Sequence, residues 1–187
     1  MHGWLKVCAP VLLSAALGCG GGAGKDTQDG PSTDTSDGAA TDANEVVCAG
    51  DRWAGDAEML AAIAGCTTIA GNLSMTGNML MGVDLPLLAR VEGFLTIWSN
   101  PMLTRVTLPA LSSIGGYLEV SWNDTLTNLA MPALRSVNER ALAKPTDVVI
   151  RDNALLPSCQ AETVRDQLLA HGFDGTFSIS NNGPCPR

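Results

Sequence analysis

The sequence has few aromatic and charged side chains, and each shortage excludes a class of protein. Aromatic residues make up only 4% of the 187 residues and charged residues only 16%. The 11 lysines and arginines are outnumbered by 19 acidic residues, so the formal net charge is −8 at pH 7. Nucleic-acid binding depends on clustered basic side chains that neutralise phosphates. We therefore expect no nucleic-acid partner.

Apolar runs are short, and the first of them has the pattern of an export signal. Lys6 precedes an apolar run at 7–17, which is shorter than the roughly 20 residues of a membrane span. A cationic head, a short apolar run and small residues in that order are typical of a secretory signal peptide. We predict such a peptide at residues 1–18.

The residues around Cys19 suggest what happens after cleavage. Residues 15–19, AALGC, resemble the lipobox of bacterial lipoproteins, in which a peptidase cleaves before the cysteine and the thiol takes a diacylglycerol. The resemblance implies lipidation at Cys19 and a membrane as partner. In a host with two membranes, Gly20 implies the outer membrane or cell surface. The alternative is an ordinary signal peptide that is cleaved nearby.

The segment that follows has too few apolar residues to fold by itself. Residues 19–46 are rich in Gly, Ser, Thr and Asp, and the stretch from Lys25 to Glu45 holds six acidic residues and one basic residue. Such a composition cannot offset the conformational entropy lost on ordering. We expect a disordered, acidic tether at 19–46, ahead of a domain at 47–187.

That domain contains an internal repeat. GNLSMTGN, GFLTIWSN and GYLEVSWN begin at Gly71, Gly93 and Gly116, and each is followed by a second matching piece. Periods of 22 and then 23 residues predict a solenoid, in which each unit makes one coil. Weaker copies occur at 146–153 and 175–182.

Within each unit, apolar residues two apart indicate a short strand with one buried face. The inward positions of the three clear units are Leu73, Met75, Leu95, Ile97, Leu118 and Val120. Because every unit enters in the same direction, the strands must stack in parallel. We predict a mainly β fold, a short parallel β-solenoid of about five coils, covered at its ends by helices at 57–64 and 160–170.

An asparagine recurs at the end of each predicted strand. These residues are Asn78, Asn100, Asn123, Asn153 and Asn182. An inward-facing amide at this position can bond to backbone groups of adjacent coils. We predict that the five form a structural ladder along the solenoid.

Four cysteines remain if Cys8 is lost with the signal peptide and Cys19 is lipidated. In an exported protein an even remainder indicates disulfides. Cys48 and Cys66 lie at the entry of the solenoid and Cys159 and Cys185 at its exit. Bridges between the two ends would cross several coils, so we predict the pairs Cys48–Cys66 and Cys159–Cys185. Metal ligation is the weaker alternative, because no Cys-x-x-Cys motif is present.

Several of these features together resemble the receptor L-domain family. They are the segment from Cys66 to Met75, the repeated Leu-Pro-x-Leu-x-x-Ile/Val pattern, and the closing segment from Asn153 to Cys159. The resemblance covers about residues 48–185. It implies a right-handed, leucine-rich-repeat-like solenoid with capping helices and terminal disulfides, and it transfers no binding residue to this chain.

The sequence offers little for catalysis. Outside the predicted signal peptide, His171 is the one histidine, and it is better placed to contact the last carbonyls of the capping helix. Polysaccharide-active solenoids use clustered acidic and basic residues on the outer face, where we expect Glu119 and Arg151 at least two coils apart. We predict a non-enzymatic lipoprotein of the cell envelope, without metal or cofactor, whose solenoid presents a recognition, adhesion or structural surface. A carbohydrate-active enzyme and a ligand-free structural spacer are the alternatives.

Two outward tryptophans are the strongest functional feature of the repeat. Trp98 and Trp122 fall one coil apart, at adjacent positions of the unit. Exposed tryptophans stack on sugar rings or anchor protein partners. With Glu119 and Arg151 they form a possible surface for an unidentified protein or glycan. The alternative is that the two rings pack on residues 139–147 or on each other.

Overall fold

The computed structural model describes residues 44–138 and 147–186. The described residues belong to one compact unit, 39–187. The predicted signal peptide, the lipidation site Cys19 and nearly all of the predicted tether lie outside them.

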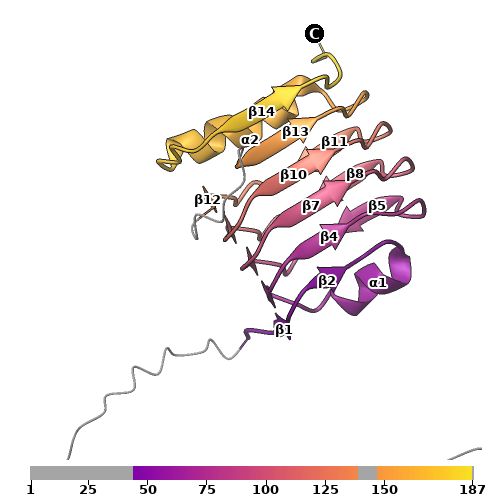
Figure 1. Cartoon of the computed structure of the whole chain (residues 1–187), viewed down its shortest axis with the longest axis vertical. Helices are drawn as coiled ribbons and strands as arrows, with labels where there is room; N and C mark the ends of the chain where they lie inside the picture. The colour runs from indigo at the N-terminus through magenta and orange to yellow at the C-terminus, as the bar shows by residue number, and fades with distance from the viewer. Residues whose placement is uncertain (1–43, 139–146, 187) are drawn as a thin grey trace, which may run out of the picture. The chain divides into compact units, whose positions relative to one another are not determined.

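The described chain winds through three parallel sheets, which confirms the predicted β-solenoid. The strands of the six-stranded sheet are, in stacking order, β2 (Arg52–Trp53), β4 (Leu73–Met75), β7 (Leu95–Trp98), β10 (Leu118–Ser121), β13 (Val148–Arg151) and β14 (Phe177–Ser180). Figure 1 shows them stacked one above another, with β2 at one end and β14 at the other.

The other two sheets form the remaining sides of the coil. The five-stranded sheet contains β1 (Val47–Ala49), β3 (Thr68–Ala70), β6 (Arg90–Val91), β9 (Ser113–Ile114) and β12 (Ser136–Val137). The three-stranded sheet contains β5 (Gly82–Asp84), β8 (Arg105–Thr107) and β11 (Asn128–Ala130). The solenoid makes about 4 turns, fewer than the five predicted. The last coil is incomplete, because among the described residues β14 adds a strand to the six-stranded sheet but no strand is added to the other two sheets.

The core consists of the apolar columns that the repeat predicts. Leu95, Ile97, Leu118 and Val120 have no exposed surface. The second half of each unit supplies the far walls, through Leu85, Leu108, Met131, Leu88, Leu111, Leu134, Val91, Ile114 and Val137, none more than 5% exposed. The coils stack so closely that a Cβ at Gly115 would overlap the carbonyl oxygen of Glu92.

Two helices contribute to the ends of the stack. Helix α1 (Ala57–Ala62) is capped by Asp56, whose Oδ1 accepts a 2.9 Å hydrogen bond from the Met59 amide. Helix α2 (Ser158–Ala170) buries Ala161, Val164 and Leu168 against the core. The sequence also suggests that Leu169 faces the stack, but Leu169 is 49% exposed because it lies one residue past the buried stripe.

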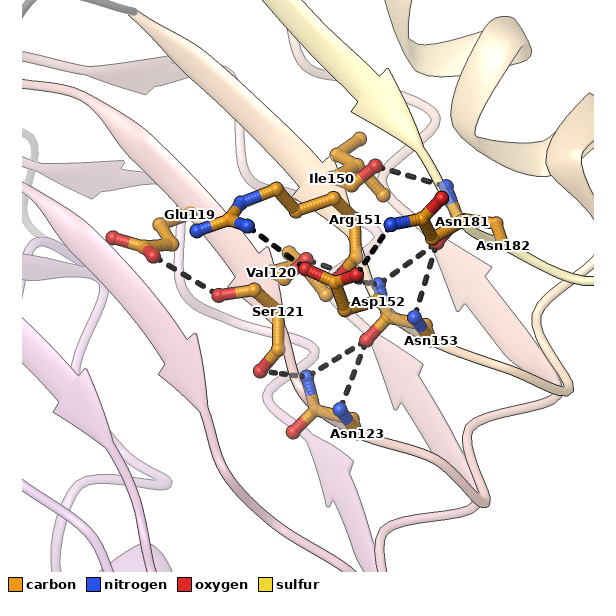
Figure 2. Close-up of polar contacts among 10 residues, drawn as sticks. All are labelled: Glu119, Val120, Ser121, Asn123, Ile150, Arg151, Asp152, Asn153, Asn181 and Asn182. Atoms are coloured by element: carbon orange, nitrogen blue, oxygen red, sulfur yellow. Dashed lines mark hydrogen bonds and ion pairs between the residues drawn. The ribbon is translucent and has the colours of Figure 1, made fainter.

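Four of the five predicted asparagines form a continuous hydrogen-bonded ladder. In each step the backbone N–H and the Nδ2 of one asparagine donate to the Oδ1 of the next, at 3.0–3.3 Å, through Asn100, Asn123, Asn153 and Asn182. Each Nδ2 also donates to a backbone carbonyl of the preceding coil, as from Asn123 to Ile97 at 3.0 Å. Asn100, Asn123 and Asn153 are fully buried, and part of the ladder is visible in Figure 2.

Asn78 lies outside this ladder, contrary to prediction. In the coils of Asn100, Asn123 and Asn153, a buried leucine follows the asparagine by three residues and its amide donates to the asparagine carbonyl, as from Leu103 to Asn100 at 3.2 Å. In the first coil the buried Leu80 follows Asn78 by only two residues. The shorter turn leaves Asn78 exposed, and the buried Oδ1 of Asn100 consequently lacks a partner among the described residues.

Both predicted disulfides are present. Cys48 joins Cys66 and Cys159 joins Cys185, with Cα–Cα distances of 5.8 and 5.7 Å. One bridge therefore ties β1 to the end of the α1 segment, and the other ties α2 to the residues after β14. In the chain-entropy model, each loop of this length adds about 3 kcal/mol of stability.

A glutamine closes one sheet edge in a way that the sequence did not suggest. Strand β11 is the last strand of its sheet, and Gln160 of α2 supplies the missing partner groups. Its Oε1 accepts from the Leu129 amide at 2.8 Å, and its Nε2 donates to the Thr127 carbonyl at 3.1 Å. The side-chain amide thus replaces a further strand at this edge.

Candidate ligand surface

The face of the six-stranded sheet that points away from the core carries the predicted surface residues. We call it the outer face. Strand register places its side chains in two columns. One column contains Trp53, Ser74, Thr96, Glu119, Val149 and Ser178, and the other contains Trp98, Ser121, Arg151 and Ser180. Each residue is held on a short paired strand, so its position relative to its neighbours is fixed.

A shallow depression of about 240 Å³ lies on this face. Its lining residues come from three consecutive coils and are Ser74, Met75, Thr76, Thr96, Trp98 and Glu119. The indole of Trp98 is 45% exposed, whereas the three hydroxyl groups and the carboxylate are half-buried. The depression therefore combines an aromatic surface with several hydrogen-bonding groups.

The carboxylate of Glu119 is oriented by its own strand. Its Oε1 accepts a 2.9 Å hydrogen bond from the Ser121 hydroxyl, as Figure 2 shows. Ser121 is itself fully buried, although it points outward. Its neighbours across the two adjacent strands are Trp98 and Arg151, whose long side chains flank it. The hydrogen bond from Ser121 therefore fixes the orientation of the Glu119 carboxylate.

Arg151 lies closer to Glu119 than the sequence suggests. The prediction of at least two coils between them is wrong, since β10 and β13 are adjacent strands and Glu119 pairs with Val149 in the register. The 30-residue spacing comes from an insertion that adds length without adding a coil. The guanidinium of Arg151 bonds the Asp152 carboxylate at 2.9 Å (Figure 2), and this half-exposed ion pair adds little stability.

The two predicted tryptophans are both exposed but lie at different kinds of position. Trp98 is the last residue of β7 and points outward, whereas Trp122 follows β10 and lies in the corner of the coil, 50% exposed. Trp122 has a φ of 60°, in the left-handed region that bulky residues rarely adopt. The corresponding corners carry Ser99, Asp152 and Asn181. The depression includes Trp98 and not Trp122.

A third tryptophan on the outer face was missed at the sequence level. Trp53 of β2 is 53% exposed and pairs with Ser74, which lines the depression. It precedes the first repeat unit, so no alignment of the repeats could assign it a position. In the structure, Trp53 and the buried Ala54 after it continue the alternation of outward and inward residues, and in the sequence this pattern is too short to be recognised.

A larger depression, about 450 Å³, lies on the five-stranded sheet. Its polar side chains already bond to one another. The Thr68 hydroxyl donates to Glu45 at 3.1 Å, and Arg90 donates to the Ser113 hydroxyl at 3.2 Å. A ligand here would have to replace these contacts, so the outer face of the six-stranded sheet is the better candidate.

Other predicted chemistry has a structural explanation. His171 ends α2, and its Nδ1 donates to the Gln167 carbonyl at 2.9 Å, as expected for a residue at a helix C-terminus. Within the described ranges no three His, Cys, Asp or Glu side chains are grouped as a metal site would require. No helix among those same residues has the length and apolarity needed to span a bilayer.

The sequence of this solenoid matches the model of a known family. The receptor L domain model matches residues 65–169, which run from the residue before Cys66 almost to the end of α2. The chain belongs to the receptor L-domain family. Membership indicates a binding or recognition role for this L domain.

The match leaves the two ends of the L domain outside the family region. Strands β1 and β2 precede it, and β14 with the second cysteine of the exit disulfide follows it. Among curated proteins, no sequence matches the chain. The ligand of this L domain must therefore be inferred from its own surface.

Proposed function

We propose that this L domain is a non-enzymatic recognition module of the cell envelope, and that it binds glycans on the outer face of the six-stranded sheet. The observation that carries the proposal is the depression in which exposed Trp98 lies beside three hydroxyl groups and the Glu119 carboxylate. An indole presents a flat apolar surface, and the surrounding oxygens can bond to sugar hydroxyls.

The rigidity of the scaffold supports recognition over catalysis. The lining residues sit on paired parallel strands above a fully buried core, so little conformational entropy is lost when a ligand binds. Glu119 is the one ionisable residue among the described residues that line the depression. A general acid–base mechanism on glycosides requires two carboxyl groups flanking the bond.

The unusual conformation of Trp122 supports a role at the edge of this surface. A left-handed conformation costs a non-glycine residue roughly 1–2 kcal/mol, and the other three corners use small polar side chains. A large exposed indole in that position is not explained by packing, because half of it is in solvent. A contact with the ligand would explain it.

The proposed location depends on the first 46 residues. Lipidation at Cys19 and a polar tether would hold the L domain away from a membrane, with the outer face available to partners. Metabolic labelling with a fatty-acid analogue tests the anchor, and we expect the label to disappear in Cys19→Ala. A labelled Cys19→Ala chain would contradict it.

The binding proposal is tested on glycan arrays with the full chain. We expect Trp98→Ala to weaken binding at least tenfold, as is common for an aromatic residue at the centre of a binding surface. Leu87→Ala is the matched control, because Leu87 is also an exposed apolar residue, 53% accessible, but lies outside the six-stranded sheet. Unchanged glycan binding by Trp98→Ala would reject the outer face as the ligand surface.

Two further results would replace the proposal. Turnover of a polysaccharide that is lost in Glu119→Gln would identify a carbohydrate-active enzyme. Absence of binding to glycans and surface proteins alike would leave a structural spacer.

A further inference from the structure

The six-stranded sheet ends at β14 with one side of that strand unpaired among the described residues. Strand β13 is its one partner. The carbonyls of Thr176 and Ser180 accept from the Val148 and Asp152 amides, both at 3.1 Å, and so face β13. Because backbone groups alternate along a strand, the N–H and C=O groups of Phe177 and Ile179 face the open edge.

Two other edges of the described solenoid are protected. At the opposite end of the same sheet, β2 is only two residues long, contains Arg52 and follows Asp51. Strand β11 is closed by the amide of Gln160. Short strands, charges and covering groups are the usual means of preventing edge-to-edge pairing. Strand β14 has four residues, Phe-Ser-Ile-Ser, with no charge and no proline.

The apolar residues of β14 are also incompletely covered. Phe177 and Ile179 occupy the same inward columns as Val148 and Ile150, which have no exposed surface. Phe177 and Ile179 are only half-buried, although Phe173 packs edge-on against Phe177 at 5.1 Å. One more strand would bury them as the inner coils are buried.

We propose that a second copy of this chain supplies that strand, through antiparallel pairing of two β14 strands about a two-fold axis at Ser178. In this register Phe177 lies opposite Ile179 of the other copy, and these residues exchange the hydrogen bonds that both direct outward. Ser178 lies opposite itself on the outer face, and Ser180 lies opposite Thr176. Apolar side chains therefore meet apolar ones and hydroxyls meet hydroxyls.

The β14 sequence favours this occupant over an unrelated strand. A two-fold interface must be self-complementary, since the same patch serves both subunits. The alternation of Phe177, Ser178, Ile179 and Ser180 meets that condition in the register centred on Ser178. Centring on Ile179 would instead place Phe177 opposite Asn181, an apolar residue opposite a polar one. The absence of charge removes the repulsion that two identical charged edges would have.

The register predicts where a disulfide can form between copies. Facing residues of a non-hydrogen-bonded antiparallel pair have Cα atoms about 4.5 Å apart, which is within disulfide range. Ser178→Cys should therefore yield disulfide-linked dimers of the full chain under mild oxidation. Ser180→Cys is the matched control, because its two copies would lie roughly 13 Å apart, at four residues' separation along a strand.

The second measurement is sedimentation equilibrium of the full chain. Pairing of four residues a side is a small interface, so we expect a dimer that dissociates on dilution. Ser178→Lys places two like charges opposite each other and should shift the chain to monomer, whereas Ser178→Thr should retain the dimer. The melting temperature of each variant reports whether it is folded.

We expect linked homodimers from Ser178→Cys several-fold above the levels of wild type and Ser180→Cys. Equal linking of the two variants, or no linking above wild type, would overturn the proposal. Linking of Ser178→Cys to a different protein alone would also overturn it, in favour of a foreign strand. A dimer that Ser178→Lys does not dissociate would overturn the register. The crosslinking pair decides the matter even where Ser178→Lys fails to fold.

Discussion

The two faces of the six-stranded sheet differ in how much their residues vary from coil to coil. On the inner face the columns hold interchangeable aliphatic residues that are fully buried from β4 to β13, and four asparagines bond in the same manner. On the outer face the same strands present tryptophan, threonine, glutamate, serine and arginine, with no residue type repeated along a column in adjacent coils. The repeat therefore determines the scaffold, and departures from it lie on the face that we propose to bind the ligand.

This difference explains why the inner face tolerates little change. Each inward side chain contacts coils above and below, so the removal of one leaves a cavity in a continuous core. Outward side chains contact solvent on one side. Substitutions on the two faces should accordingly separate stability from binding.

The largest expected contrast is between two consecutive residues of β7. Ile97→Ala should lower the free energy of unfolding by about 4 kcal/mol, because Ile97 is fully buried. Trp98→Ala should lower it by about 1 kcal/mol or less, because nearly half of the indole is already in solvent. Urea denaturation of both variants measures the contrast. Equal losses would show that Trp98 is a packing residue.

A contrast of intermediate size is expected within the asparagine series. Asn123→Ala should cost about 3 kcal/mol, since it leaves buried backbone groups of two coils without their partner, among them the Asn100 amide and the Ile97 carbonyl. Asn78→Ala should change stability by less than about 0.5 kcal/mol, because Asn78 is exposed and outside the ladder. Chemical denaturation at one temperature compares the two. A large loss of stability in Asn78→Ala would show that Asn78 is part of the ladder.

The smallest expected effect is a gain in stability. Insertion of an aspartate between Asn78 and Met79 restores the spacing of Asn123 and Leu126, so that Asn78 can donate to the unpartnered Oδ1 of Asn100. We expect about 1 kcal/mol of stabilisation, the net value of a buried hydrogen bond. The same insertion after Asn123 should be destabilising. The thermal midpoints of the two insertion variants measure the effect, and a loss in both would contradict our explanation of the first coil.

Positions that depend on the repeat could be predicted from the sequence. The inward columns, the parallel stacking and four of the ladder residues follow from spacing, because identical coils must make identical contacts. The two disulfides follow from the positions of the cysteines at the two ends of the solenoid. Asn78 was wrongly included because a 22-residue period does not reveal where the missing residue lies. The strand registers place the missing residue between Met75 and Gly82, in the turn that contains Asn78.

Features outside the repeat could not be predicted in the same way. Trp53 precedes the first unit, and Gln160 acts through a side chain that mimics a strand, which no periodicity can indicate. The adjacency of Glu119 and Arg151 was hidden by the insertion between β12 and β13. The depression itself depends on which outward residues share neighbouring coils, and therefore on the exact register of β4, β7 and β10.

The asparagine ladder also has a direction. Between side chains, each asparagine Nδ2 donates to the Oδ1 of the asparagine in the next, C-terminal coil, so these bonds along the stack are all oriented alike. A segment from Asn100 to Trp122, duplicated in tandem, would meet on both sides the same acceptors and donors that it meets now. Solenoids of this kind can thus grow or shrink by whole units in evolution or in the laboratory, while the residues of the outer face change one at a time.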